Sequence, residues 1–277
     1  MELFKGVVIV TKHKKELVIQ PLIEGNFNMK CFVTSVVDTD ELGTFSGEVT
    51  RKGSPLDAAR EKCLLGMKFE KVNAAIASEG SFGPHPQIPF VQANEEIVMF
   101  VDQEANLEIF ARELSLKSNA RSSKIENLKD LKQFAKECLF PSHGLILRQD
   151  EGIHEGIKKG IIEEELLFDY AQFLIEKNGY CFAETDMRAM YNPTRMEVIK
   201  RATEKLVSKI KRRCEKCLTP GFDIESVKIG LPCRVCGFKT RVVRAHTYSC
   251  KKCGHKQIEE FPNGMTEDPM FCDVCNP

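Results

Sequence analysis

The sequence closes with four Cys-x-x-Cys pairs: Cys214-Glu-Lys-Cys217, Cys233-Arg-Val-Cys236, Cys250-Lys-Lys-Cys253 and Cys272-Asp-Val-Cys275. A Cys-x-x-Cys turn directs two thiolates at one point, and two such turns complete the tetrahedral sulfur shell that Zn²⁺ prefers. Redox dithiols, the alternative, occur singly on an α/β background, whereas these four pairs share some sixty residues. The sequence therefore predicts a small module folded around two structural zinc ions.

Which pairs share a zinc ion is less directly encoded. Leu231-Pro-Cys-Arg-Val-Cys-Gly237 and Met270-Phe-Cys-Asp-Val-Cys-Asn276 look like one repeated unit, so we expect sequential sites. The first would use Cys214, Cys217, Cys233 and Cys236, and the second Cys250, Cys253, Cys272 and Cys275. Nested or crossed pairing stays open. Such a module resembles a double zinc ribbon, and four thiolates per ion make each site structural rather than catalytic.

Each Cys-x-x-Cys turn is called a knuckle below, and the residues around the four knuckles are strongly basic. Between residues 205 and 256 there are fourteen Lys or Arg residues and three Asp or Glu residues. A nucleic-acid surface is one explanation. We favour the other, in which part of this charge offsets the two negative charges of each tetrathiolate zinc centre, because few aromatic residues are available to stack on bases.

Composition places the chain among ordinary globular proteins. Of its 277 residues, 42% are hydrophobic and the formal net charge is zero, which argues against attraction of the whole molecule to nucleic acid. No apolar run approaches the roughly 20 residues of a membrane span, and the first residues lack a signal-peptide pattern. We therefore expect a cytoplasmic protein without a membrane partner, in which many cysteines indicate metal rather than disulfides.

Residues 1–212 alternate between helical and strand-like periodicity. Helices are expected at 15–23, 54–67, 128–138, 163–176 and 193–211, and strands at 5–11, 29–37, 72–77, 145–148 and 180–184, with a hairpin of 95–102 and 107–114. This pattern predicts an α/β body, a mixed sheet flanked by helices, followed by the double zinc-ribbon domain at 213–277. The oligomeric state is not predicted.

Four segments of the body are too polar or glycine-rich for plain packing: residues 11–16, 38–48, 78–86 and 184–195. The first follows a strand and leads into a helix, where α/β proteins bind phosphate. The third is expected to be a loop with a special backbone path around Glu79 and His85. Each segment also has a purely structural alternative. In chain order these are a solvated basic turn, a solvated acidic loop, a capped turn and an elaborate helix cap.

Some of these segments resemble an uncharacterised bacterial family that carries a domain-of-unknown-function label. The likeness rests on Ser78-Glu-Gly-Ser-Phe-Gly-Pro-His-Pro86, Glu184-Thr-Asp-Met-Arg-Ala-Met190 and Asn192-Pro-Thr-Arg-Met196, followed by the cysteine pairs.

The segment order also resembles the inosine triphosphate pyrophosphatase and Maf superfamily, which hydrolyses nucleoside triphosphates to monophosphates with Mg²⁺. The matching segments are Thr11-Lys-His-Lys-Lys-Glu16, Glu41-Leu-Gly-Thr-Phe45, Ala58-Ala-Arg-Glu-Lys-Cys63, Glu79-Gly-Ser81 and Pro193-Thr-Arg195. The sequence departs from that superfamily at His13 and Ala58, where asparagine is usual.

This second resemblance implies a site for a nucleotide and Mg²⁺. Glu41 or Glu48 would bind the metal with Glu79; Lys12, Lys15, Lys62 and Arg195 would bind phosphates; Glu184 or Asp186 would serve as base or further metal ligand. His85 would contact base or phosphate, with a capped turn as the alternative. The rival hypotheses are a nucleic-acid-binding module and a protein-interaction adaptor without catalytic activity.

Overall fold

The computed structural model describes residues 6–34 and 53–277. The chain divides into two compact units, Met1–Val207 and Ser208–Pro277. The division lies inside the last long helix, a few residues before the boundary expected from the cysteine pattern. None of the helices in the described ranges is long and apolar enough to cross a membrane.

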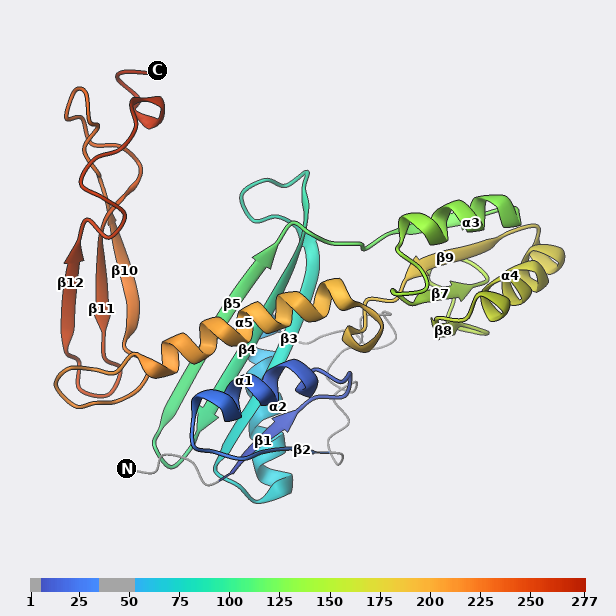
Figure 1. Cartoon of the computed structure of the whole chain (residues 1–277), viewed down its shortest axis with the longest axis horizontal. Helices are drawn as coiled ribbons and strands as arrows, with labels where there is room; N and C mark the ends of the chain where they lie inside the picture. The colour runs from blue at the N-terminus through green and yellow to red at the C-terminus, as the bar shows by residue number, and fades with distance from the viewer. Residues whose placement is uncertain (1–5, 35–52) are drawn as a thin grey trace. The chain divides into compact units, whose positions relative to one another are not determined.

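A five-stranded mixed sheet forms the centre of the first unit (Figure 1). Its strand order is β2-β1-β3-β4-β5, in which β1 pairs in parallel with both β2 and β3, and the remaining pairs are antiparallel. The strands are β1 (Val7–Val10), β2 (Cys31–Val33), β3 (Ala74–Pro84), β4 (Gln92–Asp102) and β5 (Leu107–Ser115).

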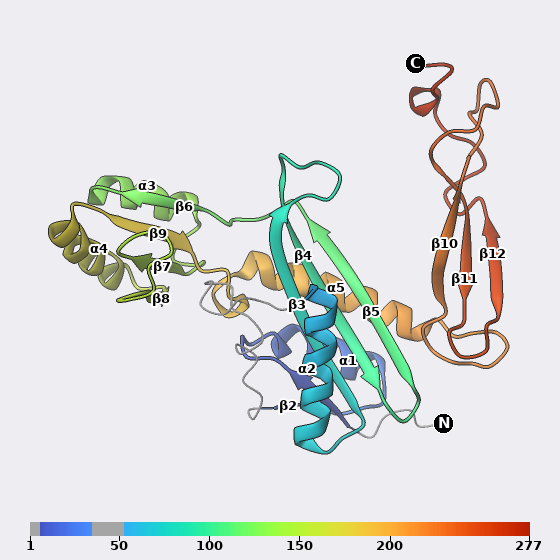
Figure 2. The same ribbon diagram turned by 180° about the vertical axis from the view of Figure 1, so that it is seen from behind.

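Helices cover both faces of this sheet. Figure 2 shows α2 (Pro55–Glu70) on one face, and Figure 1 shows α1 (Glu16–Asn26) and α5 (Pro193–Lys211) on the other. Helix α2 begins within one residue of its expected start. The Ser54 side chain accepts a hydrogen bond from the Asp57 N–H, the Asp57 side chain accepts one from the Ser54 N–H, and proline occupies the first turn. The mixed sheet flanked by helices is therefore confirmed.

A second, four-stranded antiparallel sheet lies between β5 and α5 in the chain. Its order is β6-β9-β7-β8, and α3 (Leu128–Glu137) and α4 (Glu164–Asn178) share its buried apolar core. Its strands are β6 (Ser122–Ile125), β7 (Leu145–Arg148), β8 (Lys158–Ile161) and β9 (Cys181–Thr185). The sequence predicts β7 and β9 but not β6 and β8, which are four residues each and largely polar.

The second unit contains a three-stranded antiparallel sheet in the order β10-β11-β12. Its strands are β10 (Asp223–Ile229), β11 (Val243–Ser249) and β12 (Lys256–Glu260). Two short 3-10 helices complete the described structure, η2 (Ala189–Tyr191) in the first unit and η3 (Pro269–Phe271) in the second.

One expected loop is wrong. Most of residues 78–86 continue β3, which pairs with β4 from Ala74 opposite Asp102 to Pro84 opposite Gln92. The glycines of this stretch do not end the strand, because β4 supplies a continuous antiparallel partner. The side chains of 78–84 therefore alternate between the two faces of the sheet.

Candidate functional site

The eight cysteines of the second unit form two groups of four, and within each group the ligand sulfur atoms lie within 4.8 Å of one another. One group contains Cys214, Cys217, Cys250 and Cys253; the other contains Cys233, Cys236, Cys272 and Cys275. Four convergent thiols are the donor set of a structural zinc site. Each group could hold one zinc ion.

The same backbone turn builds all four knuckles. The residue after the second cysteine donates its N–H to the carbonyl of the first at 2.8–2.9 Å, as Gly237 does to Cys233 and Gly254 to Cys250. Both glycines have φ near 70°, a left-handed conformation that glycine adopts at little cost. His255 stacks on Phe222 instead of joining a cysteine group.

The expected sequential pairing is wrong, and the pairing is crossed. Strand β10 separates the first knuckle from the second, and its seven residues extend about 23 Å. The β10–β11 ladder places Asp223 opposite Ser249, which brings Cys214 and Cys250 to the same end of the sheet. The antiparallel register, rather than sequence proximity, selects which pairs meet.

Many basic residues of this module already have acidic partners within it. Arg234 pairs with Asp268 at 2.7 Å, and Arg241 with Asp273 at 3.1 Å. Further pairs join Arg244 to Glu260, Lys256 to Glu225 and Lys209 to Asp223. These contacts lower the positive field that a nucleic-acid phosphate would meet.

In the first unit, a buried charged cluster lies where β3 and β4 meet α1, α2 and α5. Its members are Lys15, Lys62, Glu79, Glu96 and Arg195, each at most 7% exposed. Four of them were singled out from separate segments of the sequence, and the fold brings these four together. Burying five ionisable side chains is costly unless they pair, so their grouping needs a structural or functional explanation.

Lys62 and Glu79 meet on the α2 face of the sheet. Every second residue of β3 points to this face, namely Ala75, Ala77 and Glu79. The Lys62 Nζ lies 2.5 Å from Glu79 Oε2. Lys15, at the start of α1, donates from Nζ to the Ser78 carbonyl at 3.4 Å. Burial, followed by the positive charge of Arg195, lowers the pKa of Lys15 to about 7. Lys15 can therefore exchange a proton near neutral pH.

Glu96 and Arg195 form a fully buried ion pair at the other face. Arg195 Nε lies 2.6 Å from Glu96 Oε1, and Nη1 donates to the Met187 carbonyl at 2.6 Å. Gly80 stands opposite Glu96 in the ladder, and a Cβ there would lie 2.3 Å from Glu96 Oε1 and 2.7 Å from Arg195 Nη2. Glycine is thus required for the pair to pack.

Glu96 is not among the site residues expected from the sequence. It directly precedes the apolar run Ile97-Val-Met-Phe-Val101, where a carboxylate on one side of a buried strand signals a paired or functional group. The partner was not visible, because Arg195 lies 99 positions further along the chain.

Other expected site residues lie elsewhere. Lys12 is exposed in the loop between β1 and α1. The His85 ring accepts from the N–H groups of Gln87 and Ile88 through Nδ1, the geometry of a capped turn. Glu41 and Glu48 lie outside the described residues.

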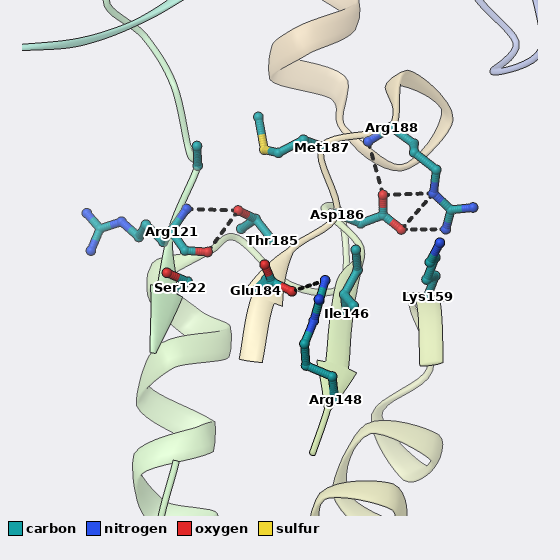
Figure 3. Close-up of a pocket in the computed structure, with 11 residues that line it drawn as sticks. Arg121, Ser122, Ile146, Arg148, Lys159, Glu184, Thr185, Asp186, Met187 and Arg188 are labelled. Atoms are coloured by element: carbon teal, nitrogen blue, oxygen red, sulfur yellow. Dashed lines mark hydrogen bonds and ion pairs between the residues drawn. The ribbon is translucent and has the colours of Figure 1, made fainter. Parts of the chain in front are cut away.

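Glu184 lies on β9 of the second sheet and Asp186 directly follows this strand; both line a pocket of about 290 Å³ (Figure 3). Asp186 is fully buried and accepts from Arg188 and from the Gly160 N–H. Glu184 lies 2.6 Å from Arg148. The pocket and the charged cluster are joined through the segment that follows β9, because Met187 lines the pocket and its carbonyl binds Arg195.

The donor sets fit zinc better than magnesium. In the part of the chain that the structure describes, the two cysteine groups are the sets of three or more ligand side chains that could hold a metal. Glu79, the expected magnesium ligand, is engaged by Lys62. The described residues therefore do not make up a magnesium site by themselves.

Fold and site together define an α/β protein with a buried charged cluster and a crossed pair of four-cysteine centres. Residues 62–277 match the model of a family described as Domain of unknown function (DUF6671), and the chain belongs to this family. The matched region begins at Lys62 and contains every member of the charged cluster except Lys15. A comparison with curated proteins gives no match.

Proposed function

We propose that the first unit is a nucleotide-binding hydrolase of the nucleoside triphosphate pyrophosphatase type, and that the charged cluster binds the phosphate chain. The observation that supports this most is the convergence of Lys15, Lys62, Glu79 and Arg195. They come from four separate segments in which they were expected to bind phosphate or metal. In the fold, Lys15 interacts electrostatically with the other three and with Glu96, two of these four on each face of the sheet. If each segment were only a helix cap or a solvated turn, there would be no reason for these side chains to lie close to one another.

The cluster has chemistry suited to phosphate. Three cationic side chains face two carboxylates, so a protonated Lys15 leaves one positive charge uncompensated. Lys15 and Lys62 are 5% and 7% exposed, which gives an incoming oxyanion a weakly hydrated cationic surface where electrostatic attraction is strong. Arg195 is fully buried and acts as a positioning residue that holds the Met187 backbone.

Hydrolysis in the superfamily that the sequence resembles needs Mg²⁺, which would polarise phosphate oxygens and lower the pKa of an attacking water. Glu79 is the candidate ligand among the described residues, and nucleotide binding would release it from Lys62 as Lys62 turns toward phosphate. Glu41 and Glu48 remain the candidates for the second carboxylate.

Pyrophosphate release from a panel of nucleoside triphosphates with Mg²⁺ tests this proposal, together with calorimetric binding of the same nucleotides. We expect Lys62→Met to weaken nucleotide binding by about tenfold or more, since it removes a charge-assisted contact. Lys68→Met is the matched control, because Lys68 is an exposed residue of the same helix. Melting temperatures of both variants report whether the fold survives.

The proposal fails if the native chain neither binds nor cleaves any nucleotide of the panel. It also fails if folded Lys62→Met and Lys68→Met proteins bind nucleotide equally well.

A second candidate function, protein-interaction adaptor, is favoured by the surface around the second cysteine group. Five apolar side chains within two residues of its cysteines are between 48% and 70% exposed: Val235, Phe238, Met270, Phe271 and Val274. Clustered exposed apolar residues mark interaction surfaces. If the chain is an adaptor alone, removing Ser208–Pro277 abolishes partner capture and the first unit binds no nucleotide.

A further inference from the structure

Helix α4 carries two apolar stripes, one of which packs on its own sheet. Leu167, Ala171 and Leu174 lie in the core of the four-stranded sheet. A second stripe runs about a quarter turn around the helix from these residues, because positions three or four apart share a face. This α4 stripe begins at the N-cap residue and ends in the last turn; it consists of Glu163, Leu166, Tyr170, Phe173 and Lys177.

The middle of the α4 stripe is apolar and exposed. Leu166 is 38% exposed and Phe173 is 53% exposed. The Tyr170 and Phe173 rings stack with their centroids 6.0 Å apart. The Tyr170 hydroxyl donates to the Gly156 carbonyl, and Lys158 Nζ lies 5.4 Å from the Tyr170 ring centroid, so the ring is held in place. Large apolar side chains that gather at the surface mark interaction sites.

The two ends of the α4 stripe carry opposite charges. Glu163 is exposed and makes no side-chain cap for the helix, and Lys177 is exposed in the last turn. Neither side chain has an ion-pair partner within the described ranges, and Lys177 Nζ lies 6.0 Å from the Phe173 ring centroid. The stripe is therefore acidic at its beginning, apolar in its middle and basic at its end.

This order of charges is self-complementary when two copies of the stripe run antiparallel. Glu163 and Lys177 each lie seven positions from Tyr170. A two-fold axis at Tyr170 therefore places Glu163 of one copy beside the partner's Lys177, twice in the same interface. Leu166 and the partner's Phe173 come together by the same symmetry. The antiparallel arrangement also brings the positive end of one helix dipole near the negative end of the other.

We propose that the α4 stripe is the interface of a symmetric dimer and that its partner is a second copy of this chain. The length of α4 sets the strength of the contact. Its 15 residues extend about 22 Å, and one helix pair of that length buries less than the roughly 1,200–2,000 Å² of a standard stable interface. The dimer is therefore reversible and depends on protein concentration.

Sedimentation equilibrium of the zinc-loaded full chain over a range of concentrations tests the proposal. We expect a monomer–dimer equilibrium that Phe173→Asp weakens by about tenfold or more, because an apolar contact is replaced by a charge on both sides of the axis. Phe69→Asp is the matched control, since Phe69 is 52% exposed on α2. Melting temperatures report whether both variants fold. A chain that is monomeric at every concentration, or a folded Phe173→Asp protein that dimerises like Phe69→Asp, would overturn the proposal.

A charge exchange tests the antiparallel arrangement itself. Lys177→Glu and Glu163→Lys should each dimerise more weakly than the native chain, because two like charges then face each other at both ends of the interface. An equimolar mixture of the two variants should recover dimerisation, since every contact between unlike copies again joins opposite charges. If the mixture associates no more tightly than the separate variants, the copies do not meet through this stripe and the proposal fails. Nucleotide binding is measured separately, and neither result depends on the other.

Discussion

The buried Glu96–Arg195 pair gives the sharpest stability prediction. Both side chains are 0% exposed and their closest atoms are 2.6 Å apart. Arg195→Met leaves the Glu96 carboxylate in the interior without its counter-ion, which costs about 3–5 kcal/mol. The double variant E96L/R195M replaces the pair with apolar groups of similar size. Such replacements are often neutral or stabilising, so the double variant should be much more stable than Arg195→Met.

Differential scanning calorimetry on the zinc-loaded chain measures this difference. For a unit of about 200 residues, 1 kcal/mol shifts Tm by about 2–4 °C, so Arg195→Met should melt roughly 6–20 °C below native. The double variant should recover most of that loss. The reasoning is refuted if the single variant melts close to native, or if the double variant is as unstable as the single one.

The same double variant distinguishes stability from function. If the pair is maintained for nucleotide binding, E96L/R195M should fold well and yet bind nucleotide more weakly, because Met187 and the following segment lose their anchor. A stable double variant with native nucleotide affinity would make the pair a purely structural feature.

Three further predictions concern zinc, pH and packing. Purified protein should contain about two zinc ions per chain. Because Cys250 and Cys217 belong to the same group, Cys250→Ser should lose one zinc ion and expose Cys217 to alkylation. Continued protection of Cys217 in that variant would contradict the crossed pairing. In the folded chain the pKa of Lys15 is about 7, below its ordinary value of 10.5. The unfolded chain therefore binds more protons between these two pH values, and the free energy of unfolding rises with pH through this window by about 1.4 kcal/mol per pH unit. Urea titrations should show less of this rise in Lys15→Met, and an equal rise in both proteins would contradict the shift. Gly80→Ala should destabilise the chain by about 1–3 kcal/mol, and Gly83→Ala, whose Cβ meets nothing within 4 Å, should cost less in the same urea titration; equal losses would contradict the packing argument.

Local pattern was sufficient where neighbours in sequence are neighbours in space. The start of the helix after Ser54, the turn between β4 and β5 and the two thiols of each Cys-x-x-Cys pair all depend on residues within about five positions of one another. Strands β6 and β8 were not predicted from the sequence, because a segment of four residues is too short to show a clear periodicity. Each becomes a strand through its ladder with β9 or β7.

The sequence by itself predicted the eight cysteines that form the two groups of four, most of the alternation of helices and strands, and four members of the charged cluster. Only the tertiary structure decided which Cys-x-x-Cys pairs come together in one group, since that depends on the β10–β11 register. It also supplied Glu96 as the partner of Arg195 and placed Arg148 beside Glu184. Paired charges distant in the chain become recognisable only when strands bring them together, because burial and distance, which set their energies, are properties of the folded chain.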